Sequence, residues 1–198
     1  MKKGLLFIFM FLILEIIGIF YYHDYLFPES EKKMIERRTK IFEAVIKDYD
    51  NSKSGKIDLK ESINIRWRIN EFKAENHKIR YCENEYQDAK YICKIDREEW
   101  FGSDFKMDLP KYELKTLSIF IDGKYVKLNI SQMFNPNSTG ELNNNQFKIK
   151  KESNYYILYG YFSDGAGTYT AHWKIKNGVS ERITLSYDEE DFEWQNSK

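Results

Sequence analysis

Few residues in this chain have types and spacing that could perform chemistry. The three histidines, His23, His77 and His172, stand far apart in the 198-residue sequence, without the spacing of metal ligands or of a catalytic triad. No glycine-rich phosphate loop follows a predicted strand. The glycines of residues 163–167 fall between two predicted strands, where a turn requires them. We therefore expect that the protein is not an enzyme.

The sharpest candidate site is a run of carboxylates and hydroxyls at residues 50–61. Oxygen ligands at alternate positions, closed by a glutamate, suit a calcium ion. With Gly55 at the turn, this run resembles the calcium loop of EF-hand proteins. The ligand positions that the resemblance implies are Asp50, Ser52, Ser54, Lys56, Asp58 and Glu61. Neighbouring lysines offset the carboxylates and imply weak affinity, and the alternative is a helix-ending turn with Gly55 as C-cap.

An apolar run at residues 5–20 predicts where the protein works. No pair of small residues follows it to serve signal peptidase, so we predict an uncleaved signal-anchor, a transmembrane helix within residues 1–27. Glu15 would cost about 2.5–3.5 kcal/mol near the bilayer centre, and the large apolar side chains around it more than offset that cost. This glutamate is either a tolerated acid or a contact to a partner helix in the membrane.

The orientation of this anchor depends on two opposing patterns. Lys2 and Lys3 favour a cytoplasmic N-terminus, whereas the more numerous basic residues of 32–38 favour the reverse. A long domain translocates largely regardless of such charges, and a cysteine pair suits an oxidising compartment. We predict a single-pass protein of the cell inner membrane, with its C-terminal domain on the periplasmic or extracytoplasmic side.

The rest of the chain predicts an α+β fold, mainly antiparallel β. Residues 31–48 have the apolar spacing of an amphipathic helix, with Ser30 as N-cap. From residue 63 onward apolar and polar residues alternate, which is typical of strands. We expect one domain at residues 28–187, with the helix packed on a sheet of about seven strands. The apolar stripe of the helix consists of Met34, Ile35, Ile41, Phe42, Val45 and Ile46.

The cysteines predict a disulfide in the first hairpin. A turn at residues 87–88 places Cys82 opposite Cys93, close enough for a bond in an oxidising compartment. The alternative is an unpaired, reduced couple. The two cysteines can bond only if the strands pair in this register. The predicted disulfide is therefore also a prediction of how the two strands align.

Two later hairpins have clear turn residues. Asp122 and Gly123 predict a two-residue turn that pairs Ile119 with Val126. For the last hairpin we predict a three-residue loop ending at Gly178, because the resulting pairs keep the apolar residues on one face. That loop would pair Ile175 with Val179 and Ala171 with Ile183.

Aromatic residues make up 17% of the chain, and tyrosines and phenylalanines alternate with polar residues in its C-terminal half. Residues 155–162 are apolar on both faces, which predicts a central strand. Five aromatics could form an exposed sugar or peptide platform, although most are expected in the core: Tyr155, Tyr159, Tyr161, Tyr169 and Trp173. The acidic tail at residues 188–198 carries Phe192 and Trp194, which either bind a basic partner or dock against the sheet.

Two further features bear on function. The formal net charge of zero gives no reason to expect nucleic acid as a partner. Lys3-Gly4 before the apolar run, the amphipathic helix and a sheet with two cysteines resemble type IV pilin-like proteins, although Phe9 stands where that family has an acid.

We expect a membrane-anchored extracytoplasmic protein-binding module, with an immunity or inhibitor protein as its concrete form. One alternative is a calcium-binding module built on residues 50–61, in which calcium would be the cofactor. The other is a pilin-like assembly subunit. The expected partners are the membrane and another protein.

Overall fold

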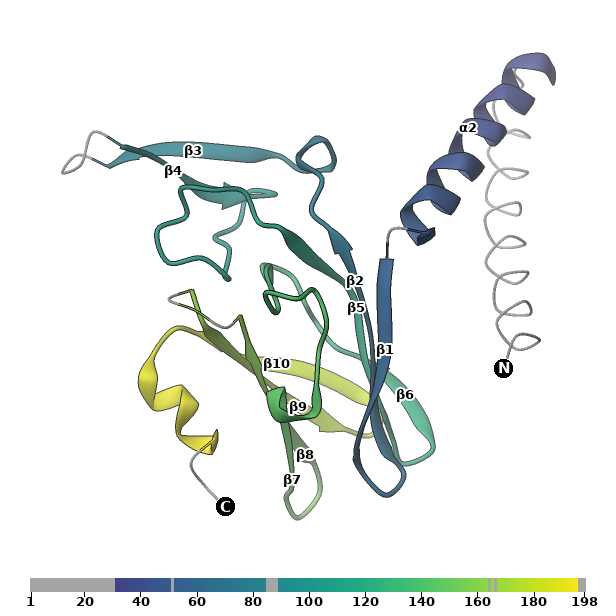
Figure 1. Cartoon of the computed structure of the whole chain (residues 1–198). Coiled ribbons are helices and arrows are strands. Elements are labelled where there is room, and N and C mark those ends of the chain that lie inside the picture. Colours follow the sequence, from purple (N-terminus) through teal and green to yellow (C-terminus); the bar gives the residue numbers. More distant parts are fainter. Residues whose placement is uncertain (1–30, 51, 85–88, 164, 166, 196–198) are drawn as a thin grey trace. The chain divides into compact units, whose positions relative to one another are not determined.

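The computed structural model describes residues 31–50, 52–84, 89–163, 165 and 167–195 (Figure 1). It divides the chain into two units, one ending at Tyr49 and the other beginning at Asp50. The predicted membrane helix, Glu15 included, lies outside the described residues. Within the described ranges, no helix has both the length and the apolar character needed to cross a membrane.

The first unit contributes the helix α2 (Glu31–Asp50), which ends two residues beyond the predicted one. Ile35 and Phe42, from the predicted apolar stripe, are exposed. The expected packing of this helix on a sheet face concerns two separate units and stays a prediction.

The second unit confirms the predicted preponderance of antiparallel strands, but their number and grouping differ from the prediction. The described residues form ten strands in three sheets, not one sheet of about seven. The first sheet has the order β1 (Ser52–Lys60), β2 (Ile63–Glu71), β5 (Tyr112–Ile121), β6 (Lys124–Lys127). The second has the order β10 (Val179–Ser186), β9 (Tyr169–Lys176), β8 (Tyr156–Phe162), β7 (Phe147–Lys151). The third sheet is a two-stranded ribbon formed by β3 (Ile79–Asn84) and β4 (Ala89–Ile95).

Short 3₁₀ helices complete the described fold: η1 (Ala74–Asn76), η2 (Asn144–Gln146) and η3 (Glu189–Gln195). The sequence failed to predict β1 because that strand lies at the end of its sheet and buries little. Only Ile57 of its nine residues is buried, so lysines and serines dominate its pattern. An edge strand can form without the alternation that identifies a half-buried one.

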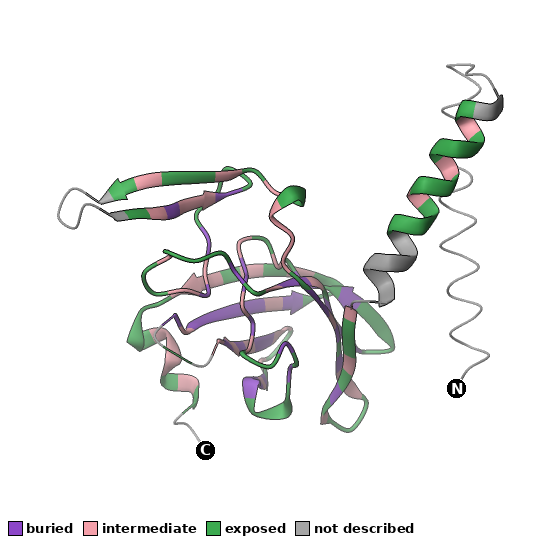
Figure 2. Ribbon diagram, turned by 45° about the horizontal axis from the view of Figure 1, so that its top comes forward, coloured by how far each residue is buried: buried purple, intermediate pink, exposed green. Residues whose placement is uncertain are grey.

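One apolar core fills the space between the two four-stranded sheets. Ile65 and Leu117 from the first sheet, and Leu158 and Trp173 from the second, belong to this core and have no exposed surface. Figure 2 shows buried residues along the strands of both sheets. The Ser180 hydroxyl of β10 donates to the carbonyl oxygen of a residue on β6, so the two sheets also meet at their edges.

The β5–β6 hairpin confirms its predicted register, with Ile119 opposite Val126. The turn residues Asp122 and Gly123 have φ angles of 50° and 75°. Positive φ at both central positions identifies the turn type that matches the twist of the flanking strands.

The predicted three-residue loop of the last hairpin is wrong. Asn177 and Gly178 form a two-residue turn, with φ angles of 54° and 78°, and Trp173 lies opposite Arg182. A bulge at Ile183 then shifts the register by one residue. Beyond the bulge, Leu185 lies opposite the buried Ala171. The bulge therefore produces the change of face that the prediction attributed to a longer loop.

Gly123 allows a direct test of this turn geometry. A Cβ at Gly123 would meet no atom within 4 Å, so the Gly123→Ala substitution adds left-handed backbone strain without a steric clash. We expect it to lower the free energy of unfolding by about 1 kcal/mol in urea denaturation. Gly165 is the matched control, since it too has open space but no positive φ. An equal loss in Gly165→Ala would contradict the assigned turn.

Candidate functional site

A disulfide links Cys82 and Cys93 across the β3–β4 ribbon, with their Cα atoms 5.7 Å apart. The bond was predicted correctly, but its register was not. Cys82 lies opposite Tyr91, and a bulge that opens after Arg80 leaves Cys93 as the extra residue. The bridge closes a short loop and stabilises the ribbon by at most about 3 kcal/mol.

Large apolar side chains are exposed on this ribbon and in the segment at residues 105–109 that follows it. We call them the apolar patch, and its members and exposed fractions are Tyr81 (56%), Phe105 (68%), Met107 (48%) and Leu109 (41%). The Ile92 N–H donates to the Lys106 carbonyl over 2.7 Å, which places residues 105–107 alongside β4. Tyr81 lies on β3, opposite Ile92 of β4. Clustered exposed apolar residues are typical of interaction surfaces.

A small separate core holds the base of the ribbon. Ile92, Ile95, Trp100 and Phe134 are buried together, away from the main core. The Trp100 indole donates to the Ile92 carbonyl over 2.8 Å and meets Phe134 edge to face. A ribbon fixed in this way can present the apolar patch with little conformational entropy to lose on binding.

The apolar patch was not predicted from the sequence. Phe105, Met107 and Leu109 alternate with Lys106 and Asp108, and this alternation was the available signal. Alternation alone predicts a half-buried strand, whereas these side chains remain exposed. Only the tertiary structure shows that this segment lies beside β4.

A charged cluster joins the start of the ribbon to β5. His77 Nδ1 lies 2.7 Å from an Asp96 carboxylate oxygen, and His77 Nε2 lies 3.1 Å from one of Glu113. Lys115 Nζ also contacts Glu113, at 2.7 Å. Burial acts to raise the pKa of Asp96, but hydrogen bonds from the Lys78 N–H and from His77 outweigh it and lower the pKa. We interpret the cluster as structural, because it ties three elements together through paired charges.

The predicted calcium loop at residues 50–61 does not form a loop. Residues 52–60 are strand β1, in which the side chains of Ser52, Ser54, Lys56 and Asp58 follow one face of an extended chain. In a strand, side chains on the same face are about 6.6 Å apart along the chain, so this strand cannot wrap its side chains around one ion. In the described part of the chain, no three His, Cys, Asp or Glu residues are grouped to hold a metal.

Two other details of this segment concern charge and space. Lys56 Nζ pairs with an Asp58 carboxylate oxygen at 2.6 Å, and Glu61 lies exposed in the turn between β1 and β2. Gly55 is neither a calcium-loop turn nor a helix C-cap. A Cβ there would come within 2.7 Å of the Trp67 indole, so Gly55 leaves room for that ring. Calcium binding itself stays a prediction, without the expected loop geometry.

The two aromatic residues of the acidic tail dock on the second sheet. Trp194 stacks on Tyr159 with ring centroids 5.6 Å apart, and Phe192 meets Tyr161 edge to face. The Trp194 indole donates to the Thr170 hydroxyl over 3.2 Å. Of the two alternatives for these aromatics, docking against the sheet is the one observed. Partner binding by Phe192 and Trp194 stays a prediction.

The expected aromatic platform is divided between the core and this docking face. Tyr169 and Trp173 are fully buried in the core, while Tyr155, Tyr159 and Tyr161 are half-buried. β8 is a central strand, as predicted from its two apolar faces. The tail covers two of the three half-buried tyrosines, so these five side chains do not form one open surface.

His172 lies under the docked tail. Its Nε2 is 3.1 Å from the Asp191 carbonyl oxygen, which can only accept, so this nitrogen carries the proton. The ring meets Tyr159 edge to face at 4.8 Å. Burial lowers the pKa of His172, although the Asp191 carboxylate and carbonyl oppose that shift.

Comparisons with known protein families, with curated protein sequences and with solved structures gave no match. Function must therefore be inferred from the chain's own residues.

The docked tail predicts a pH dependence of stability. Because the folded state favours neutral His172, the unfolded chain binds a proton first as pH falls below 6.5. Stability should therefore decrease from about pH 7 to about pH 5. His172→Gln keeps a side chain that can donate to Asp191 but removes this titration, so its melting temperature should change less over that range. Parallel pH profiles of the two proteins would contradict the assignment.

Proposed function

We propose that this protein is a membrane-anchored, extracytoplasmic protein-binding module that contacts its partner through the apolar patch. The observation that carries the proposal is the exposure of four large apolar side chains beside a disulfide-linked ribbon. Their burial in a complex would be favourable at about 25 cal/mol for each Å² removed from water.

The surroundings of the apolar patch support a protein partner. Arg80, Asp104 and Asp108 adjoin its members in the sequence, are exposed and carry charges of both signs. An apolar centre with a polar rim is the usual anatomy of a protein–protein interface. The patch also contains Tyr81 and Phe105, which belong to the residue types enriched at such interfaces.

The shape of the ribbon supports the more specific form of the proposal. Figure 1 shows β3 and β4 extending as a narrow arm from the two larger sheets. Such an arm can enter a recess on a toxin or hydrolase and block it, as an immunity or inhibitor protein would. The disulfide and the apolar run at residues 5–20 support action at the extracytoplasmic side of a membrane.

The two alternative functions have less support. In the calcium alternative, residues 52–60 would have to leave their strand to surround an ion. The pilin-like alternative shares antiparallel sheets and a disulfide with our proposal, so those features do not favour it.

The apolar patch can be tested by substituting the two members that flank Lys106. The partner is first identified by cross-linking to this protein and is then purified. The double variant Phe105→Ser and Met107→Ser should weaken its binding by at least about tenfold, because two large apolar side chains no longer become buried in the complex. Val179→Ser is the matched control, since Val179 is also apolar and 69% exposed but lies on β10. Equal affinities of the wild type and the double variant, measured by biolayer interferometry, would refute the proposal.

The compartment can be tested through the cysteines. In native membranes, Cys82 and Cys93 should resist a thiol-alkylating reagent until a reductant is added, and mass spectrometry can read the added mass. Alkylation without reductant would show that the cysteines are reduced, and would contradict an extracytoplasmic domain.

A further inference from the structure

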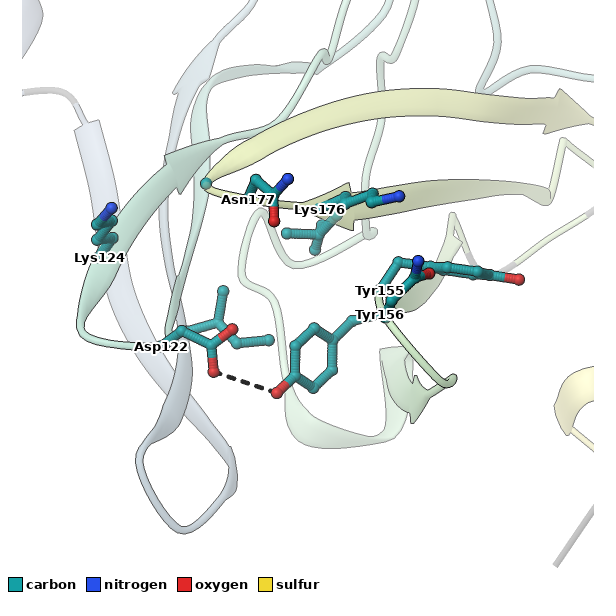
Figure 3. Close-up of a pocket in the computed structure, with 10 residues that line it drawn as sticks. Asp122, Lys124, Tyr155, Tyr156, Lys176 and Asn177 are labelled. Carbon is teal, nitrogen blue, oxygen red and sulfur yellow. Dashed lines mark hydrogen bonds between the residues drawn. The ribbon is translucent and has the colours of Figure 1, made fainter.

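A pocket of about 310 Å³ opens where two tight turns meet the start of β8 (Figure 3). One turn joins β5 to β6 and the other joins β9 to β10. The lining residues are Ile121, Asp122, Lys124, Asn154, Tyr155, Tyr156, Ile175, Lys176, Asn177 and Gly178.

Fixed contacts hold the walls of this pocket. Tyr156 pairs with Ile175 in the β8–β9 ladder, and its hydroxyl donates to an Asp122 carboxylate oxygen over 3.1 Å. Figure 3 shows this bond between the two sheets. The Lys124 stem lies against the other turn, since a Cβ at Gly178 would be 3.6 Å from Lys124 Cδ. The pocket is therefore present before any ligand binds.

Lysines dominate the charge of the pocket. Lys124 and Lys176 line it, Lys174 Nζ lies 4.9 Å from the centre of the Tyr155 ring, and Lys151 Nζ lies 5.6 Å from that of Tyr156. The single carboxylate of the lining, Asp122, already accepts the Tyr156 hydroxyl. The lining therefore carries two ammonium groups and one carboxylate, and this excess of positive charge favours a bound anion.

We propose that this pocket binds a small multivalent oxyanion, a ligand that carries phosphate or carboxylate groups. Lysine ammonium groups and the amides of Asn154 and Asn177 are donors suited to such oxygens. The volume is at the low end of that of ligand pockets, so it suits a small molecule. In Figure 1 the β5–β6 turn and the β3–β4 ribbon lie at opposite ends of this unit, so the site is separate from the apolar patch.

Pyrophosphate and citrate are suitable probes, because they distinguish the two sources of oxyanion charge. Isothermal titration calorimetry of the full chain in a nonionic detergent should show saturable binding of at least one of them. The affinity should fall as sodium chloride is raised, because the attraction is electrostatic. Preference for pyrophosphate would assign the ligand to phosphate esters, and preference for citrate to polycarboxylates.

Three substitutions give a pattern that only this site predicts. Lys124→Gln and Lys176→Gln should each weaken binding by about fivefold or more, because each removes one nearby cation. Asp122→Asn should tighten binding by a similar factor, because it removes the one carboxylate and retains an acceptor for Tyr156. Asparagine also suits the left-handed position at residue 122, so this variant should fold.

Lys111→Gln is the matched control, since Lys111 is exposed, makes the same change of charge and lies outside the lining. It should leave the affinity unchanged. The absence of saturable binding by either probe would overturn the proposal. An equal loss in the Lys111 variant would also overturn it, because that result would indicate attraction to the overall charge. Circular dichroism of each variant verifies that its fold is intact.

Discussion

Burial of Trp173 between the two four-stranded sheets is the interaction on which the rest of the second unit depends. Its indole has no exposed surface, meets Phe162 edge to face and donates to the Asn129 carbonyl over 2.9 Å. Gly160 lacks a side chain where a Cβ would come within 2.7 Å of the Phe162 ring and 3.1 Å of the Trp173 ring. Burial of an aromatic group this large contributes several kcal/mol, and its polar N–H must be satisfied at the same time. This packing fixes the second sheet against the loop that leaves β6, and so sets the spacing of the two sheets.

The candidate sites lie at the edges of this shared core. Closing two sheets around one apolar interior leaves their turns and connecting segments at the surface, where polar groups and ligands can meet. At one end, the two glycine turns approach each other and create a pocket lined by lysines. At the other, the ribbon extends from a second small core containing Trp100, and a disulfide limits its motion. The Tyr156–Asp122 hydrogen bond restrains the pocket and the disulfide restrains the ribbon, and such restraint reduces the entropy cost of binding.

Local residue chemistry was a reliable guide where a single turn or strand determined the outcome. The Asp122-Gly123 turn, the central position of β8 and the cysteine bond all followed from neighbouring residues. The prediction was wrong where a bulge adds one residue to a strand. Bulges near Arg80 and Ile183 each change the register by one position. Strand β1 was missed because its lysines, serines and glycine contribute only one buried side chain.

The sequence by itself therefore determined the preponderance of antiparallel strands, the helix at residues 31–48 and the two cysteines that form a bond, because periodicity and spacing are local properties. Only the tertiary structure decided that residues 52–60 pair as a strand, that Trp194 docks on Tyr159, and that Lys124 and Lys176 line one pocket. These outcomes depend on which segments meet across the fold. Contacts between residues far apart in the chain follow from packing of the whole core, and no short stretch of sequence encodes them.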